Sequence, residues 1–579
     1  MATCREDRPA QQWSLALIPD DWAQKVGEAD LLFAAVEPEE DLQASVGNGY
    51  LSTTVGSDTI YVSGVFNGLG SRDPSHRARI PSPLAITVDN AVPYASGLDL
   101  KEAAFYRRSY VDSVTPVEQR WYASRETLRS TLVHELSVSA QLSGPVTLSL
   151  SVRPGLLPNA DIDFVTERET DEVLVQCGST RVAEIAGGEL TCVCTSASKV
   201  PPSVTIPAGS NATLVHIFSV RTSLDSADPL RDVSLDFAQA VTLVDNGDLW
   251  GDHTASWGAL WGAGIQVDTL VDQELAQAVN SSLYYILSSV RDDWPHSLSP
   301  GGLASNGYNG HTFWDCETWV YPILLSNYPP LALSTLKYRL DRLEGARAKA
   351  QSYNPPYRGT MFPWECAATG VETTPVWADT GLYEIHISGD IVFAVQQHYL
   401  QSGDFAWLVG YQDLVLGVAE FWESRVKNVT LPGGYEFHIA GVIPPDEYAH
   451  GDNSVFTNVV AKISLEFAAD LLLKLGTAAP SGYSAAIWMD IANRLRIPFD
   501  TARNVHLEYD GYQGALIKQA DVVLLGYPLN WNMSQAVRAN DANYYIERTD
   551  EFGPAMTWGM YAIAYLELNQ PEKADPLFR

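Results

Sequence analysis

The spacing of apolar residues changes along the chain, and this change limits what the chain can fold into. Before about residue 245, Val146, Leu148, Leu150 and Val152 alternate with Thr and Ser. Alternation of this kind is typical of half-buried β-strands, because successive side chains point to opposite faces of a sheet. Gly and Pro separate many such segments, which predicts an all-β sandwich for residues 1–245. The other segments of this type lie at 59–65, 136–142, 172–176 and 214–220.

After residue 270 the apolar residues follow a helical spacing. Leu275, Val279 and Leu283 share one face of a predicted helix, and a second stripe of this kind occupies residues 459–471. Some ten helices without alternating strands predict a helical toroid or solenoid for residues 271–579, although no fixed sequence period supports a solenoid. Further helical stretches fit residues 316–326, 331–350, 384–400, 404–426, 482–495, 512–525, 533–547 and 555–569. Residues 246–270, which include three Trp, are predicted to form a linker helix.

The charge balance excludes some classes of partner. The chain has 37 Lys and Arg against 70 Asp and Glu, a formal net charge of −33, so nucleic acids and anionic membranes would be repelled. No apolar run is long enough to span a membrane, and the first residues do not resemble a signal peptide. We therefore expect a cytoplasmic protein. The 16 Trp and the abundant carboxylates suit a protein that binds sugars, although the aromatic residues could equally fill the core.

The six cysteines show no spacing typical of a metal site. Cys192 and Cys194 are too close for an easy bridge to each other, and no Cys-x-x-Cys or Cys/His pair is present. We expect buried free thiols, with no metal and no cofactor.

Four clusters of polar and aromatic residues in the helical half are candidates for chemistry. Each has an alternative interpretation as a helix start, an acidic surface turn or a solvated helix face. Prolines fix the loop that carries the acids of the third cluster. The clusters are 311–319 with Trp314 and Asp315, 361–365 with Trp364 and Glu365 followed by Glu372 and Trp377, 443–448 with Asp446 and Glu447, and 518–521 with Lys518 and Gln519. His386 and His398 are interpreted as packed rather than catalytic.

These clusters lie within segments that resemble glycoside hydrolase family 65. The segments are FWDCETW (313–319), FPWECAATGVETTP (362–375), EIHISGDIVFAVQQHY (384–399), PPDEYAHGDNSVFTN (444–458) and KQADVVLL (518–525). Residues 47–68 also resemble the N-terminal domain of that family. The resemblance runs from about residue 30 to the end of the chain. It implies an N-terminal super-β-sandwich, a linker helix and an (α/α)6 barrel.

The resemblance also implies roles for individual residues. Glu447 matches the general acid of an inverting mechanism on α-glucosides. The residues that match contacts to the glucosyl unit are Trp314, Asp315, Trp364, Glu365, Lys518 and Gln519. In an inverting hydrolase the base lies about 6.5–9.5 Å from the acid, leaving room for a water molecule.

The family's hydrolases carry this base in a Trp-Ser-Glu-like motif far beyond the acid. Only 132 residues follow Glu447 (579 − 447), and none of them forms this motif. The predicted helices are also fewer than six hairpins require. We therefore expect a barrel that is incomplete at its C-terminal end, with the general base outside this chain.

Within the family, the resemblance is closest to members that act on the collagen disaccharide. It implies an inverting exo-α-glucosidase that removes glucose from the glucosyl-α-1,2-galactosyl unit on hydroxylysine, without metal or cofactor. One alternative is a family phosphorylase acting on maltose, trehalose or kojibiose. Another is a catalytically silent, shortened protein that at most binds glycan.

Overall fold

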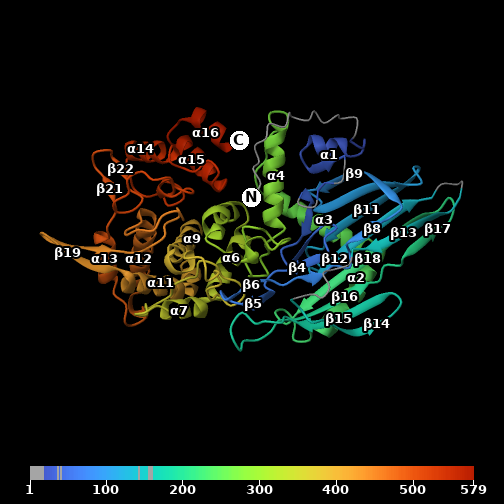
Figure 1. Cartoon of the computed structure of the whole chain (residues 1–579), viewed down its shortest axis with the longest axis horizontal. Helices are drawn as coiled ribbons and strands as arrows, with labels where there is room; N and C mark the ends of the chain where they lie inside the picture. Colours follow the sequence, from blue (N-terminus) through green and yellow to red (C-terminus); the bar gives the residue numbers. More distant parts are fainter. Residues whose placement is uncertain (1–17, 36–37, 40–41, 141–143, 154–160) are drawn as a thin grey trace.

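The structure is a computed structural model that describes residues 18–35, 38–39, 42–140, 144–153 and 161–579. It contains an N-terminal region rich in β-sheet and a C-terminal helical region (Figure 1). The first residues of the chain, which bear on the expected absence of a signal peptide, and Cys4 lie outside the described residues.

A nine-stranded antiparallel sheet forms the main layer of the N-terminal region. Smaller sheets pack against it through apolar side chains such as Val46, Ile60 and Leu148. In spatial order the large sheet consists of β1 (Leu31–Ala34), β9 (Ala91–Asp99), β10 (Ala104–Val111), β11 (Thr115–Ala123), β12 (Thr131–Ser139), β18 (Asn211–Thr222), β16 (Cys192–Ser198), β15 (Val173–Ser179) and β14 (Val165–Glu169). The smaller sheets are β2 (Ser45–Gly47), β3 (Leu51–Thr54), β4 (Thr59–Val62) and β7 (Ile80–Pro81); β17 (Ser203–Ile206), β13 (Val146–Val152) and β8 (Ile86–Val88); and β5 (Phe66–Leu69) with β6 (Asp73–Arg77).

Apart from the short α1 near the N-terminus, the α-helices of the described residues lie from residue 229 onward. Polar side chains cap several of them: Asp272 accepts a hydrogen bond from the Leu275 amide at the start of α4, and Ser454 from the Thr457 amide at the start of α12. The helices are α1 (Ala23–Gly27), α2 (Pro229–Asp245), α3 (Asp248–Trp261), α4 (Gln273–Leu287), α5 (Tyr321–Asn327), α6 (Pro329–Leu340), α7 (Leu343–Gln351), α8 (Thr380–Tyr383), α9 (Ile387–Ser402), α10 (Phe405–Gly410), α11 (Gln412–Arg425), α12 (Val455–Leu475), α13 (Ala485–Arg494), α14 (Gln535–Ile546), α15 (Met556–Glu567) and α16 (Pro571–Phe578). Two hairpins interrupt them, β19 (Lys427–Leu431) with β20 (Gly434–His438) and β21 (Phe499–Asp500) with β22 (Val505–His506).

Most expected elements are confirmed. Strands occupy 146–152 and 211–222, and α4 carries the predicted apolar stripe with Leu283 buried. The predicted helix over 331–350 is wrong in one respect, because it breaks into α6 and α7. At the break Arg342 turns its guanidinium to the carbonyl oxygen of Ala368, 2.9 Å away.

The predicted helix over 512–525 is wrong. Only Val522–Leu525 forms a short 3₁₀ turn. The amide of Ile517 donates to the carbonyl of Arg548 (2.8 Å), and the amide of Lys518 donates to the carboxylate of Asp446 (2.6 Å). These tertiary hydrogen bonds replace the helical ones that the amides would otherwise form.

The expectation of free thiols is also wrong for one pair. Strands β15 and β16 place Cys177 directly opposite Cys194, and the two form a disulfide. Strand pairing brings these residues together, whereas their separation of 17 residues in the sequence gave no sign of it. Cys192, Cys316 and Cys366 are free.

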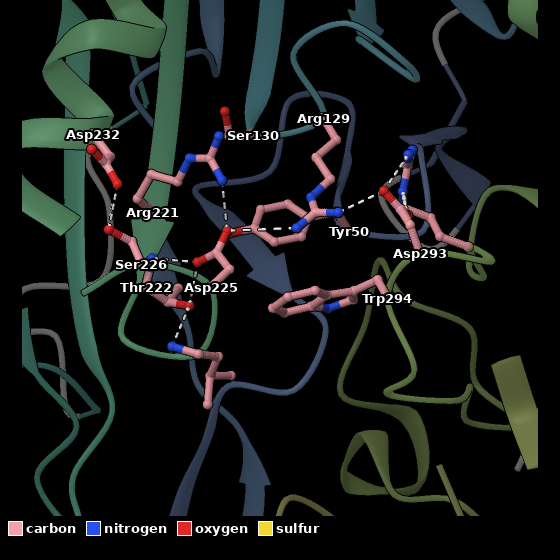
Figure 2. Close-up of polar contacts among 12 residues, drawn as sticks. Tyr50, Arg129, Ser130, Arg221, Thr222, Asp225, Ser226, Asp232, Asp293 and Trp294 are labelled. Carbon is pink, nitrogen blue, oxygen red and sulfur yellow. Dashed lines mark hydrogen bonds and ion pairs between the residues drawn. The ribbon is translucent and has the colours of Figure 1, made fainter. Parts of the chain in front are cut away.

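The two regions share an apolar core and a set of polar contacts. The Tyr50 hydroxyl donates to Asp225 (3.1 Å), and Arg129 lies over the rings of Tyr50 and Trp294 while pairing with Asp293 (2.6 Å) (Figure 2). Tyr50, just before strand β3, also packs against Trp294 in the segment after α4, with ring centroids 5.0 Å apart. Among the described residues, no helix combines the length and apolar character needed to cross a bilayer.

Arg77 of the β-rich region reaches further into the helical region. Its guanidinium donates to the backbone carbonyls of Gly302, Ser305 and Gly310, at 3.0, 2.9 and 3.2 Å. The side chain is buried, and burial lowers the pKa of Arg77 to about 10. The β-rich region therefore fixes the loop that leads into the cluster at 311–319.

Candidate active site

Loops carry all four clusters predicted from the sequence. Residues 314–315 directly precede a π-helical turn, 364–365 lie in the loop after α7, 444–448 lie in the loop before α12, and 518–521 precede the 3₁₀ turn. Loops held by a rigid scaffold are common positions for binding side chains.

Glu447 and Lys518 meet across this site. The Lys518 ammonium lies 2.9 Å from the Glu447 carboxylate, and about a quarter of each side chain is exposed (28% and 26%). Two of the predicted clusters, far apart in the sequence, are therefore in contact. Their partial exposure leaves both groups accessible to a ligand.

The backbone around Glu447 is held by the same segment. The Asp446 carboxylate accepts hydrogen bonds from the amides of Lys518 (2.6 Å) and Tyr448 (3.1 Å). The Gln519 side-chain amide donates to the carbonyl of Pro445 (2.7 Å). Gln519 is buried, so in this structure it secures the loop in front of Glu447.

Asp315 stands at the start of the π-helical turn Cys316–Val320. Burial raises the pKa of Asp315 to about 6, and the negative charges of Glu447 and Glu317 add to this effect. Asp315 is therefore close enough to Glu447 to sense its charge. π-Helical turns are frequent at functional sites, and no sequence pattern predicted this one.

Glu317, the other carboxylate of this cluster, is a structural residue. It forms a buried ion pair with Arg339, whose two nitrogens lie 2.8 and 2.9 Å from its oxygens. Arg339 also donates to the carbonyl of Phe313 (2.9 Å). The pair thus fixes the backbone immediately before Trp314.

Trp314 and Trp364 are both buried and meet through His386. The His386 ring lies edge-on to each, with ring centroids 4.7 Å from Trp314 and 5.9 Å from Trp364. His386 thereby joins the first and second clusters. His386 and His398 are both buried, as expected for packed side chains.

His386 also belongs to an ionic network that the sequence did not reveal. Its ring nitrogens lie 2.6 Å from Asp390 and 3.2 Å from Glu384. Burial opposes the charged ring, but the two carboxylates outweigh it and raise the pKa of His386 to about 10. The pKa of Glu384 is well above its usual range, chiefly through burial, with a contribution from the charge of Glu447. Glu384 is therefore a residue of the candidate site, although the resemblance over 384–399 assigned it no role.

The loop that carries Trp364 and Glu365 is tied at several points. Glu365 bonds to His311 (2.7 Å), and Glu372 accepts hydrogen bonds from the amides of Trp364 (3.1 Å) and Glu365 (3.3 Å). Glu372 thus organises the loop. Trp377, by contrast, is 82% exposed and stands apart from this network.

The β-rich region contributes to the same loop. The Glu184 carboxylate accepts hydrogen bonds from the amides of Ala368 (3.0 Å) and Thr369 (2.8 Å), and from the hydroxyl of Ser75 (3.2 Å). Glu184 belongs to a stretch without a recognisable motif. Its role in holding this loop can therefore be seen only in the tertiary structure.

A cavity of about 550 Å³ lies elsewhere, between strands of the β-rich region. Arg107, Gln119 and Arg153 are among its lining residues, and the described residues of the lining include no carboxylate. Hydrolysis of a glycosidic bond requires a proton donor, so the carboxylates around Glu447 are the better candidate site. Among the described residues, no three His, Cys, Asp or Glu side chains are placed to hold a metal ion.

Known proteins resemble this chain over most of its length. The model of the glycosyl hydrolase family 65 central catalytic domain matches residues 281–515. A protein-glucosylgalactosylhydroxylysine glucosidase of Dictyostelium discoideum is 40% identical over 579 residues, covering 96% of this chain and 79% of its own length. The protein of that name in Danio rerio is 36% identical over 549 residues. The match covers 90% of this chain and 79% of the length of that protein. A solved structure named as a kojibiose phosphorylase, from the human microbiome, superposes with a TM-score of 0.78 at 15% identity. It covers 95% of this chain and 84% of its own, a likeness that concerns the fold alone.

Proposed function

The chain belongs to glycoside hydrolase family 65 and is a glycoside hydrolase, and on this premise we propose its substrate and mechanism. The proposed reaction is the removal of glucose from the glucosyl-α-1,2-galactosyl unit on hydroxylysine of collagen-type glycans, with inversion at the anomeric carbon. The names of the two relatives support this substrate.

In this proposal Glu447 is the general acid that protonates the departing glycosidic oxygen. The observation that carries the proposal is the 2.9 Å contact between Lys518 and Glu447, which joins two family motifs beside Asp315. The Lys518 ammonium pairs with the acid. A glucosyl unit whose hydroxyls bind Lys518 would release Glu447 from this pair and let it carry a proton.

The remaining site residues are proposed to hold the glucosyl unit. Asp315 and Glu365 would accept hydrogen bonds from sugar hydroxyls. The buried rings of Trp314 and Trp364, together with Gln519, would form the wall and floor of the subsite. The opposing base, which an inverting hydrolase needs about 6.5–9.5 Å from the acid, has no residue assigned to it.

Three broader predictions accompany this function. Two of these predictions concern the fold. The first is the set of domain bounds 1–245, 246–270 and 271–579. The second is an (α/α)6 barrel with an open C-terminal end, which is supported by the packing of α5 on α6, α11 on α12 and α14 on α15. The cytoplasmic location also stays a prediction. The Cys177–Cys194 disulfide weighs against it, because disulfides are rare in reducing compartments.

The test incubates the 579-residue chain with glucosylgalactosyl-hydroxylysine, with and without phosphate, and measures glucose and glucose 1-phosphate. Release of β-glucose without phosphate supports the proposal, and release of glucose 1-phosphate would establish a phosphorylase instead. No product in either condition would favour a silent, glycan-binding protein. Glu447→Gln is expected to lower kcat by about 10²- to 10⁴-fold, the usual range for loss of a general acid.

A further inference from the structure

Three carboxyl groups lie buried directly behind Glu447. Asp446, Glu508 and Asp521 are 2%, 0% and 0% exposed. Asp446 precedes the proposed acid, Asp521 ends the segment that begins with Lys518, and Glu508 follows strand β22. Such a cluster is costly to bury if all its members are ionised.

Two of the three carboxyls receive hydrogen bonds from backbone amides. Asp446 accepts from Lys518 and Tyr448, as described above, and Asp521 accepts from the amide of Asp446 (3.1 Å). Each of these two groups can therefore carry negative charge with at least one donor facing it.

Glu508 differs from its neighbours. Both of its carboxyl oxygens are buried, and no N–H or O–H donor of the described residues bonds to them. Among the described residues, the polar side-chain group that acts on it at hydrogen-bonding range is the carboxyl of Asp446. Two carboxylates are both acceptors, so this contact requires a proton between them.

The surroundings of Glu508 offer no alternative partner. The charged or titratable groups that face it are Asp446, Asp521 and four tyrosines, Tyr509, Tyr512, Tyr545 and Tyr561. The hydroxyls of Tyr512 and Tyr545 donate instead to the carbonyls of Ala515 (2.6 Å) and His506 (2.9 Å). His386 acts on Asp521, and no cation of the described residues acts on Glu508.

We propose that Glu508 is a positioning residue that works as a neutral carboxylic acid. Its O–H donates a hydrogen bond to the Asp446 carboxylate and so fixes the loop 444–448 that presents Glu447. The proposal rests on the proposed role of Glu447 as the acid. In agreement with it, burial and then the charges of Asp521 and Asp446 hold the pKa of Glu508 far above its usual range.

The neutral state matters because ionised Glu508 would place two negative charges in contact. Repulsion would push Asp446 away, and the amides of Lys518 and Tyr448 that bond to Asp446 would move with it. Glu447 lies between Asp446 and Tyr448 in the chain, so its carboxyl would leave the position from which it reaches the glycosidic oxygen.

The test compares Glu508→Gln with Glu508→Leu on two substrates. Gln keeps a donor and cannot ionise, whereas Leu removes the donor at similar size. On glucosylgalactosyl-hydroxylysine, Glu508→Leu is expected to lower kcat by about 10- to 100-fold with KM nearly unchanged, as for a misplaced catalytic group. Glu508→Gln is expected to restore most of that loss. A folded Glu508→Gln variant with the same loss as Glu508→Leu would overturn the proposal.

The second substrate is α-glucosyl fluoride, whose leaving group needs little help from an acid. Both Glu508 variants are expected to hydrolyse it at nearly the wild-type rate. If Glu508→Leu loses this activity as well, Glu508 supports the whole site rather than the acid, and the proposal is wrong. If Glu447→Gln retains full activity on the glycoside while the Glu508 effects persist, the assigned acid fails and the neutral Glu508 stands.

A measurement without turnover keeps the proposal testable in an inactive protein. Infrared difference spectra of wild type against Glu508→Gln, recorded at pH 7, should show the carbonyl stretch of one protonated carboxylic acid that the variant lacks. Absence of this band would overturn the proposal, whatever the activity.

Discussion

The Lys518 ammonium and the Glu447 carboxylate lie 2.9 Å apart and join two loops of the helical region. Neither residue comes from a regular helix, and the backbone beside each is tied to the other segment through Asp446 and Gln519. The contact is therefore a fixed property of the fold and not a chance meeting of two flexible surface side chains.

Replacing Lys518 by Met should lower kcat/KM by about 10- to 100-fold, because a hydrogen bond to a charged group contributes about 1.5–3 kcal/mol and 1.4 kcal/mol is tenfold. Initial rates of glucose release over a range of substrate concentrations measure the effect. Lys474→Met is the matched control, since the exposed Lys474 pairs with the exposed Asp470 and contacts Tyr399, away from Glu447. Equal activity of the two variants would remove Lys518 from the site.

Asp315 should make the stability of the protein depend on pH. Its folded pKa of about 6 lies above the ordinary value of 3.8, because burial disfavours the ionised form. The folded state therefore binds the proton more tightly than the unfolded state. The contribution to stability is complete below about pH 4 and is lost as the pH rises through about 6.

The comparison of wild type with Asp315→Asn isolates this effect from other carboxylates. Between about pH 4 and 6 the wild type should lose up to about 1.4 kcal/mol per pH unit relative to the variant, and the difference should be constant above that range. Urea unfolding at a series of pH values measures it. Parallel curves for the two proteins would show that Asp315 is not buried as described.

Glu184 of the β-rich region holds the loop that carries Trp364. Glu184→Ala would leave the amides of Ala368 and Thr369 without an acceptor and loosen the loop that carries Trp364. We expect kcat/KM to fall about tenfold, since small misplacements of binding residues are costly. The exposed Glu172→Ala serves as the control in the same region. A loss of activity in both variants would point to a general defect of the region.

Arg339 should contribute strongly to stability. Its guanidinium and Glu317 are both buried, so Arg339→Met leaves an unpaired charge and should cost about 3–5 kcal/mol of unfolding free energy. Lys337→Met, which breaks an exposed pair with Asp341, should cost less than about 1 kcal/mol. Urea unfolding followed by circular dichroism compares the two. Adding Glu317→Gln to Arg339→Met should recover part of the loss.

Local patterns in the sequence predicted much of the fold. Alternation over 146–152 gave a strand, and the stripe through Leu283 gave helix α4, because one face of each element is buried. The same reasoning failed over 512–525. Asp446 and Arg548, distant in sequence, take up the backbone hydrogen bonds of that segment, which no local pattern records.

In the candidate site too, sequence motifs predicted some residues, and contacts between distant elements determine the others. Motifs pointed to Glu447 and Lys518, whose side chains are partly exposed. They also pointed to Trp314 and Trp364, whose side chains are buried. Glu384 and Glu508 were missed, because their significance comes from burial and from neighbours on other elements. A single carboxylate in a sequence carries no sign of whether it will be ionised. Only its surroundings decide.

The Cys177–Cys194 disulfide gives the last prediction. It joins adjacent strands β15 and β16 and closes a loop between residues 17 positions apart. Closing a loop of this size restricts the unfolded chain and stabilises the fold by about 3 kcal/mol. Replacing both residues by Ser should therefore lower the urea midpoint, whereas Cys192→Ser should leave it nearly unchanged. Reductant should destabilise the wild type and leave the double variant unaffected. If alkylation without reductant labels both Cys177 and Cys194 in the purified protein, the disulfide is absent and the predicted stabilisation is wrong. The objection to a cytoplasmic location then no longer holds.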